Sequence, residues 1–545
     1  MADLMSHSAA PEVVFEGLPP ILGQGDVLST SLLASLNWQD RQRFLSFGWG
    51  EAASPRFPTV LDAIAFQFAH QPHERAVMWQ GRAMTYGELD HASNKLAAAL
   101  QAKGVGPGSV VGLYLKRSIP MVVGIVAVMK LGAAYAPQHV GVAPDEILTH
   151  VAAVSAAPVV LTMRDCFAAL PAFETASVLV IEDVLEAEAL TSVPDLALRP
   201  KPEDRCILLF TSGTTGQPNG VQVTHANLAN VLFTAPGDLG IRPGQKVGQI
   251  LSIAFDMAAW ETLGALGNGA TLVIRGSSIQ ETAEQVDVLI ATPSILGKLD
   301  VDRCRQIKTV AVAGEPCPRP LADLWGSFCT FINSCGPTET TIINTAAVHR
   351  PEKPVLSIGK PTPNNTVYVL DENLMPLPIG EVGEMWAGGE CVSLGYLANE
   401  ALTEERYRPD PFRPGHMMFR TRDLGRWTED GELEHFGRVD DMVKIRGFRV
   451  ELDGVSRTIE TTQGCQQAVT LKYDDRSLVA FVTPASVDVE AASRAVGDHL
   501  PYYCVPAAIL PLPSLPLTPR GKLDKRLLLS MARDHIEAQA SELNS

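Results

Sequence analysis

Apolar residues recur along the chain with two different spacings. Over residues 59–103 the spacing is mostly helical, and Leu61, Ile64 and Phe68 fall on one helical face. A helical run also covers residues 121–130. Between these stretches, short continuous apolar runs are typical of buried strands; they cover residues 110–115, 159–162, 178–181 and 206–210. This alternation predicts an α/β fold with largely parallel strands.

Composition narrows the class of protein. The chain has 545 residues, of which 46% are apolar and 19% charged, as in an ordinary protein with several domains. Its net charge of −17 argues against nonspecific nucleic-acid binding and against an anionic membrane surface. The nine cysteines contain no CxxC pair, so a cytoplasmic location is expected rather than a zinc site or a disulfide framework. No targeting segment and no membrane span are expected.

A loop rich in glycine and hydroxyl groups follows the predicted strand at 206–210. It reads Phe210-Thr-Ser-Gly-Thr-Thr-Gly-Gln-Pro-Asn-Gly-Val221. Glycines let a backbone approach a ligand closely, and free N–H groups and hydroxyls suit phosphate oxygens. The loop lacks the Gly-Lys-Ser/Thr ending of the usual nucleotide loop. Composition alone therefore leaves an ordinary turn as the alternative.

The order of residues in this loop resembles the phosphate loop of the adenylate-forming superfamily. That superfamily contains acyl-CoA synthetases, luciferases and, closest to this chain, the adenylation domains of nonribosomal peptide synthetases. Further motifs follow in the same order over about residues 55–530. The resemblance implies that the nucleotide contacts Thr211, Ser212, Gly213, Thr214, Thr215, Gly216, Gly314, Cys335, Gly336, Asp423 and Arg438.

Catalytic roles are implied by the same resemblance. Thr338 would contact the α-phosphate, and Glu339 would bind Mg²⁺. Asp423 would bind the ribose hydroxyls. Lys522, in the stretch Leu-Thr-Pro-Arg-Gly-Lys, would meet the oxygens of the substrate carboxylate and phosphate.

Three positions depart from the family pattern. Asn219 stands where the family usually has Lys, which weakens the charge compensation of a triphosphate. Cys335 replaces the aromatic residue that holds the adenine. Arg422 replaces a Gly; it would be strained if that Gly needs a positive φ, or it could return a cation near the phosphates.

Asp256 lies in an apolar stretch, where a carboxylate is costly unless it is paired. It could cap a helix that starts at Met257. The phrase Phe-Asp-x-x-x-Trp-Glu instead resembles the amino-acid-activating branch of the superfamily, in which this Asp pairs with the α-ammonium. Motif matching then lines the substrate pocket with Asp256, Met257, Trp260, Ile290, Ala311, Ala313, Ser334, Ile342 and Ile343. Because these are almost all apolar, an uncharged, apolar amino acid of medium or large size is predicted.

The resemblance implies an α/β large domain with a β-rich subdomain and a small, mobile α+β C-terminal domain. We predict an N-terminal leader or packing arm at 1–55, the large domain at 56–439 and the small domain at 440–545, with the hinge at Asp440.

The implied reaction uses ATP and Mg²⁺ to convert the amino acid to its adenylate with release of pyrophosphate. No carrier signature follows Lys522, so transfer to the phosphopantetheine thiol of a separate carrier protein is expected. An acyl- or aryl-CoA synthetase for an acid without an amine is one alternative. A binding protein with impaired catalysis is the other.

Overall fold

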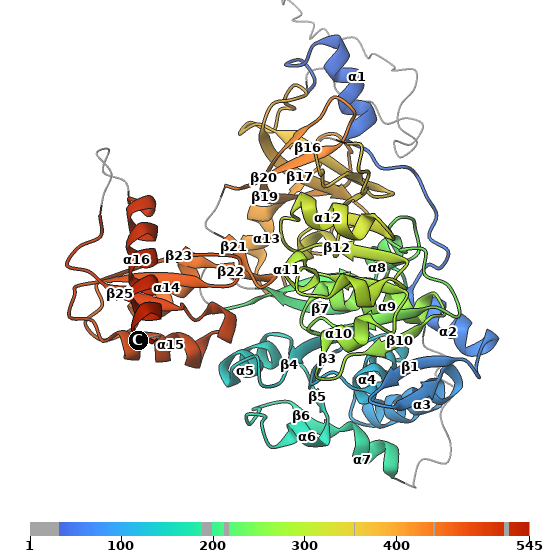
Figure 1. Ribbon diagram of the computed structural model, residues 1–545. Coiled ribbons are helices and arrows are strands. Elements are labelled where there is room, and N and C mark those ends of the chain that lie inside the picture. The colour runs from blue at the N-terminus through green and yellow to red at the C-terminus, as the bar shows by residue number, and fades with distance from the viewer. Residues whose placement is uncertain are drawn as a thin grey trace, which may run out of the picture.

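The computed structural model describes residues 32–187, 199–211, 217–353, 355–439, 442–516 and 523–543. These residues form an α/β large domain, a β-rich subdomain and a small α+β domain, so the predicted fold class is confirmed (Figure 1). We call the described part of 442–543 the small domain, because its strands share no sheet with the other described strands. No helix in these ranges is both long and apolar enough to cross a bilayer. The predicted site residues outside these ranges are Ser212, Gly213, Thr214, Thr215, Gly216, Asp440 and Lys522.

The largest sheet has nine strands. Its six inner strands, from β13 to β1, run parallel to one another. Parallel strands end at the same edge of a sheet, so the loops after them meet there. In spatial order the strands are β15 (Lys360–Pro361), β14 (Thr345–Val348), β13 (Thr330–Cys335), β12 (Thr309–Val312), β11 (Val288–Ala291), β9 (Lys246–Gln249), β10 (Thr271–Ile274), β1 (Arg75–Trp79) and β2 (Arg82–Thr85).

A six-stranded sheet contains the four strands predicted from apolar runs. Two of them, at 110–115 and 159–162, have the predicted bounds, because both are buried along their whole length. In spatial order the strands are β6 (Ser177–Val180), β5 (Val159–Thr162), β3 (Val110–Leu115), β4 (Ala134–His139), β7 (Arg205–Thr211) and β8 (Asn219–Thr224).

Side chains cap the N-termini of two helices of the large domain. Ser118 caps α4 (Ile119–Lys130) by accepting a hydrogen bond from the Met121 amide. Thr85 and Glu88 form a reciprocal capping box at the start of α3. The other helices of the large domain are α2 (Val60–His70), α3 (Tyr86–Ala102), α5 (Asp145–Val154), α6 (Arg164–Phe167), α7 (Ile181–Glu186), α8 (His225–Leu232), α9 (Asp256–Gly267), α10 (Ile279–Ala283), α11 (Pro293–Leu296) and α12 (Arg319–Gly326).

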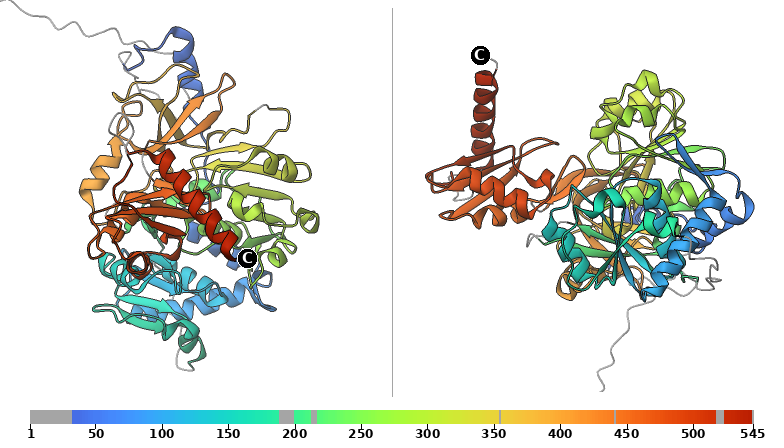
Figure 2. Two further views of the ribbon diagram at one scale, coloured as in Figure 1. Left: turned by 60° about the vertical axis from the view of Figure 1, so that its left-hand side comes forward. Right: turned by 90° about the horizontal axis from the view of Figure 1, so that it is seen from below.

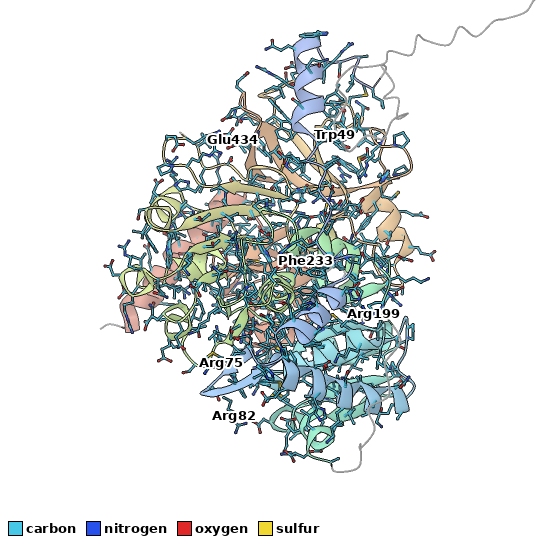
Figure 3. The ribbon with its side chains drawn as sticks, turned by 90° about the vertical axis from the view of Figure 1, so that its right-hand side faces the viewer. Trp49, Arg75, Arg82, Arg199, Phe233 and Glu434 are labelled. Carbon is cyan, nitrogen blue, oxygen red and sulfur yellow. The ribbon has the colours of Figure 1, made fainter. Side chains whose placement is uncertain are left out.

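The β-rich subdomain packs against the N-terminal helix α1 (Trp38–Phe47). Phe44 of α1 stacks on Tyr368 with ring centroids 5.7 Å apart, and Trp49 meets the same ring edge-on at 5.3 Å. Figure 3 shows Trp49 near α1, at the opposite end of the molecule from Arg82. The elements of the subdomain are β16 (Asn365–Leu370), β17 (Gly383–Gly389), β18 (Tyr407–Pro409), β19 (Met417–Trp427), β20 (Leu433–Arg438) and α13 (Glu400–Arg406).

The small domain projects from the large domain, with α16 standing out on its far side (Figure 2). A hairpin of β21 (Met442–Ile445) and β22 (Phe448–Glu451) faces the large domain. On α15, the His499 ring also forms a hydrogen bond with the Glu146 carboxylate of α5, at 2.6 Å. The remaining elements are β23 (Gln467–Lys472), β24 (Leu478–Thr483), β25 (Ala508–Pro511), α14 (Leu452–Glu460), α15 (Val489–His499) and α16 (Lys525–Leu543).

Candidate active site

A cavity of about 490 Å³ lies between the large domain and the β21–β22 hairpin. Its walls come from the ends of β12 and β13, the start of α9, and strands β19 and β20. This convergence brings together residues predicted for the substrate and for the nucleotide: Asp256, Met257, Ala313, Gly314, Ser334, Cys335, Gly336, Thr338, Ile342, Asp423 and Arg438.

The other residues predicted for the substrate pocket do not line this cavity. Ile290, Ala311 and Ile343 are fully buried in the hydrophobic core. Trp260 is also fully buried, and its indole Nε1 donates to the carbonyl of Gly237 at 2.6 Å. A buried indole usually finds such an acceptor. Motif matching cannot predict this one, because Gly237 lies outside the motif. Of the apolar residues predicted for the pocket, Met257, Ala313 and Ile342 line the cavity.

Asp256 is the first residue of α9 and lies on the cavity wall. Its Oδ1 accepts a hydrogen bond from the Met257 amide at 2.7 Å, and its Oδ2 accepts one from the Thr338 hydroxyl at 3.0 Å. Burial raises the pKa of this carboxyl, although the two hydrogen bonds and the charge of Lys444 oppose that effect. Both observed donors are neutral, so the site favours a cationic ligand near Asp256.

A fully buried carboxylate supports the segment that precedes Asp256. Glu261 of α9 accepts hydrogen bonds from the amides of Ile250 and Leu251, at 2.8 and 3.2 Å. Burial raises its pKa to about 8. These bonds join α9 to the end of β9, which fixes where the helix begins.

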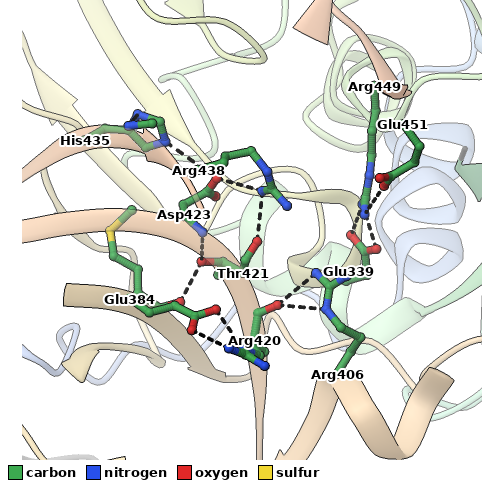
Figure 4. A network of polar contacts seen from close by, with 12 residues as sticks. Glu339, Glu384, Arg406, Arg420, Thr421, Asp423, His435, Arg438, Arg449 and Glu451 are labelled. Carbon is green, nitrogen blue, oxygen red and sulfur yellow. Dashed lines mark hydrogen bonds and ion pairs between the residues drawn. The ribbon is translucent and has the colours of Figure 1, made fainter. Parts of the chain in front are cut away.

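Asp423 forms a second polar centre on the cavity wall. Arg438 Nη1 lies 2.7 Å from Asp423 Oδ1 and donates to the Thr421 carbonyl at 2.9 Å (Figure 4). His435 Nε2 lies 3.6 Å from the same carboxylate oxygen. Burial disfavours the charged form of Asp423, but His435 and Arg438 hold its pKa well below the usual range. Asp423 is therefore an anionic group that can accept hydrogen bonds from hydroxyl donors.

Arg422, next to it, has the positive φ of 62° that favours glycine. Its Nη2 pairs with Glu405, and Arg422 is not among the residues that line the cavity. Of the two alternatives for Arg422, the strained backbone with a positive φ is therefore the one observed. The guanidinium pairs with Glu405.

Glu339 lies in the short helix η2 (Thr338–Thr340) and has no exposed surface. Arg449 Nη1 donates to both carboxylate oxygens, at 2.8 and 3.0 Å, and Tyr396 donates to Oε1 at 2.5 Å. Burial opposes ionisation, yet Arg449, Arg406 and the Tyr396 hydroxyl keep the pKa of Glu339 below its ordinary value.

The chemistry of Glu339 suits the predicted Mg²⁺, because an ionised carboxylate is a hard oxygen ligand. Mg²⁺ commonly takes one or two protein carboxylates and completes its shell with phosphates and waters. Among the described residues, no cluster of three or more His, Cys, Asp or Glu could hold a metal by itself. Glu339 fits the ion as a single ligand, but in this arrangement a guanidinium covers it.

A smaller cavity of about 120 Å³ lies beside the first. It contains the predicted loop residue Thr211 and shares Phe255, Asp256, Thr338 and Arg449 with the larger cavity. The small domain supplies part of its wall: Phe448, Leu500, Pro501, Tyr503 and Cys504. The two cavities therefore meet at the carboxylate of Asp256.

The three departures from the family pattern have distinct surroundings. Cys335 is on the wall of the larger cavity, and burial raises the pKa of its thiol to about 12, so it stays protonated. A Cβ at neighbouring Gly336 would lie 2.6 Å from the Ile343 Cα, which requires glycine there. Asn219 Oδ1 accepts a hydrogen bond from Asn399 at 2.9 Å, so its side chain is fixed by a neutral partner.

Motif reasoning missed the small-domain residues that enter the site. Lys444 of β21 lines the larger cavity. In β22, Arg449 lines both cavities and Phe448 lines the smaller one. Phe448 packs between Phe255, at 4.3 Å, and Tyr503, at 3.8 Å between ring centroids. These residues belong to the stretch Lys-Ile-Arg-Gly-Phe-Arg, which the sequence shows. Which of their side chains enter the site depends on how the two domains meet.

Comparisons with known proteins agree with these features. The AMP-binding enzyme family matches residues 64–397. An adenylate-forming reductase of Coprinopsis cinerea is 44% identical over 515 residues, which is 93% of this chain and 50% of the reductase. The isonitrile lipopeptide synthase of Mycobacterium tuberculosis is 36% identical over 523 residues, which is 92% of this chain and 20% of the synthase. The chain thus spans half the length of the first relative and less of the second.

A solved structure has a similar fold. It is an NRPS protein containing adenylation and PCP domains bound to a vinylsulfonamide inhibitor. Its TM-score is 0.78 at 24% identity, and the match covers 88% of this chain and 85% of that one. The family match, the relatives and the similar fold lead to the same conclusion. The chain belongs to the AMP-binding enzyme family and is an adenylate-forming enzyme of the nonribosomal peptide synthetase-like type.

Proposed function

We propose that this protein activates an amino acid with an uncharged side chain as its adenylate and passes it to a carrier-protein thiol. The observation that carries the proposal is Asp256, a half-buried carboxylate on the cavity wall whose hydrogen-bond donors are neutral. An α-ammonium would complete its charge balance. An acid without an amine would leave the carboxylate unpaired, which is costly in a buried site.

The adenylation step places a carboxylate oxygen of the amino acid against the α-phosphorus of ATP, and pyrophosphate leaves. Thr338 contacts the α-phosphate, while Asp423 binds the ribose hydroxyls and Arg438 holds Asp423 in place. Lys522 and the loop residues 212–216 supply further donors to the transferring group. Glu339 would hold Mg²⁺, which would supply positive charge for the phosphate oxygens.

The side chain of the amino acid faces Met257, Ala313, Ser334 and Ile342. None of these is charged, which supports an uncharged substrate. Ser334 is 4% exposed, and its hydroxyl has no hydrogen-bond partner among the described residues. That hydroxyl oxygen is buried away from the cavity surface, so the wall presented to the substrate stays apolar, which supports an apolar side chain.

The second step uses the smaller cavity, which joins the larger one at Asp256 and Thr338. Its position between the domains suits a slender thiol arm that approaches the adenylate from outside. The small domain, turning about Asp440, opens and closes this route. The similar solved structure contains a PCP domain, which supports a carrier protein as partner. All nine cysteines are unpaired, which supports a reducing compartment such as the cytoplasm.

The decisive experiment is substrate-dependent exchange of labelled pyrophosphate into ATP. The panel contains the proteinogenic amino acids and a set of aryl, keto and fatty acids. Exchange with an uncharged amino acid is expected. Exchange only with acids that lack an amine would instead identify an acyl-activating enzyme. Silence with every acid, from folded protein that binds ATP, would identify a non-catalytic binding protein.

A further inference from the structure

A β-bulge aims two side chains of β20 at the carboxylate of Asp423. On the paired strands, Asp423 of β19 lies opposite Arg438, and Gly425 lies opposite His435, so two positions along β19 match three positions along β20. In a regular strand, residues three apart point to opposite faces, whereas an extra residue in one strand re-aims a side chain. His435 and Arg438 therefore both approach Asp423 (Figure 4).

The tautomer of His435 follows from a backbone contact. The amide of Gly437 donates a hydrogen bond to His435 Nδ1 at 3.2 Å. A ring nitrogen that accepts a hydrogen bond carries no proton, so the neutral ring keeps its proton on Nε2. Nε2 is the atom that lies 3.6 Å from Asp423 Oδ1. That separation is longer than a hydrogen bond, so the Nε2–H group can still donate to a ligand.

Asp423 can accept from a ligand at the same place. Arg438 Nη1 lies 2.7 Å from Asp423 Oδ1, and His435 approaches the same oxygen. Because both contacts involve Oδ1, a ligand can use Oδ2. Asp423 and His435 both line the larger cavity, and their side chains are 12% and 25% exposed. The cavity wall therefore presents a neutral N–H donor next to an anionic acceptor.

We propose that His435 recognises the ribose, and that its Nε2–H donates to the same nucleotide hydroxyl that donates to Asp423. The inference rests on the proposed function, which places the ribose of ATP at Asp423. A hydroxyl donates one hydrogen bond and accepts another at the same time, so this donor and acceptor together read a single hydroxyl. A nucleotide without that hydroxyl leaves both groups without a partner, which disfavours its binding. His435 thereby helps the site to select ribonucleotides over deoxynucleotides.

Binding of ATP, 2′-deoxy-ATP and 3′-deoxy-ATP to the full chain, measured by calorimetry, tests this role without turnover. In the wild type, one of the two analogues should bind at least about tenfold more weakly than ATP, because it loses a charge-assisted and a neutral hydrogen bond. That analogue identifies the hydroxyl. His435→Phe keeps a ring but removes the donor, and should weaken ATP binding about fivefold. It should not weaken the binding of the sensitive analogue any further.

Two further variants separate recognition from support of the fold. His435→Gln can place an amide N–H near the position of Nε2, so it should restore most of the affinity for ATP. His91→Phe changes an exposed histidine of α3 and is the control, which should leave all three affinities unchanged. If His435→Phe weakens all three nucleotides by the same factor, His435 has only a structural role and the inference is overturned.

Nitrogen NMR of protein labelled in its histidine rings gives a readout that does not depend on affinity. The neutral ring of His435 should carry its proton on Nε2, and ATP should shift the Nε2 resonance more than the sensitive analogue does. A proton on Nδ1 in the neutral ring would overturn the inference, as would failure of the chain to bind ATP. The predicted pattern of affinities without any pyrophosphate exchange would instead defeat the proposed function and leave the inference standing.

Discussion

The hydroxyl of Thr338 donates a hydrogen bond to Oδ2 of Asp256 over 3.0 Å, although the two residues are 82 positions apart. One residue is predicted to contact the α-phosphate and the other the substrate amine. The bond therefore connects the part of the site predicted for the substrate amine to the part predicted for the nucleotide. It also leaves Asp256 without a cationic hydrogen-bond partner among the observed donors, which makes the amine the natural one.

Asp256→Asn should lower pyrophosphate exchange with the amino acid by about 100-fold, mainly through KM, because the buried ammonium loses its charged partner. Exchange with the matching acid without an amine should not fall. Asp302→Asn changes an exposed carboxylate and is the control. An equal loss for both kinds of acid would show that Asp256 supports the fold rather than the amine.

Asn219→Lys should raise pyrophosphate exchange by about tenfold, since a cation beside the triphosphate compensates its charge. The substitution removes the hydrogen bond from Asn399, so Asn219→Gln serves as a neutral control. A gain in both variants would show that loss of the Asn399 bond matters. No gain with Lys would show that the missing cation at position 219 does not limit the exchange.

Arg422→Gly should stabilise the protein by about 1 kcal/mol, because a non-glycine residue with a φ of 62° is strained. The ion pair with Glu405 is lost in the same change and offsets part of the gain, since exposed pairs contribute about 0–1 kcal/mol. Chemical unfolding in the Glu405→Gln background removes that ion-pair contribution. A decrease in stability there would mean that the strain is relieved by other contacts of Arg422.

His225 should make the fold acid-sensitive. It is fully buried, neither ring nitrogen has a hydrogen-bond partner among the described residues, and burial lowers its pKa to about 4. The unfolded chain binds a proton near the ordinary value of 6.5, so stability is lost as pH falls from about 6.5 towards 4. At pH 5 this loss is about 2 kcal/mol relative to pH 7.5.

His225→Leu should reduce that difference, as urea unfolding of the large domain at the two pH values would measure. Comparison within each protein cancels any change in packing. The prediction fails if the variant loses as much stability between pH 7.5 and pH 5 as the wild type does.

The order of apolar runs along the chain determined the α/β class and the position of several elements of the large domain. The strands at 110–115 and 159–162 agree residue for residue, because a continuous apolar run has only one way to be buried in a parallel sheet. The Thr85–Glu88 capping box was equally local, since its partners are three residues apart. Local chemistry and motif order therefore sufficed for the fold and the family.

Only the tertiary structure decided which side chains share the cavity. Trp260 and Met257 are neighbours on α9, yet the indole turns to a core carbonyl while the thioether lines the site. Arg449 lies 110 positions from Glu339, and no local pattern relates the two. Such pairs form because domains meet in three dimensions and buried charges must find partners, and that choice depends on distance in space rather than on spacing along the chain.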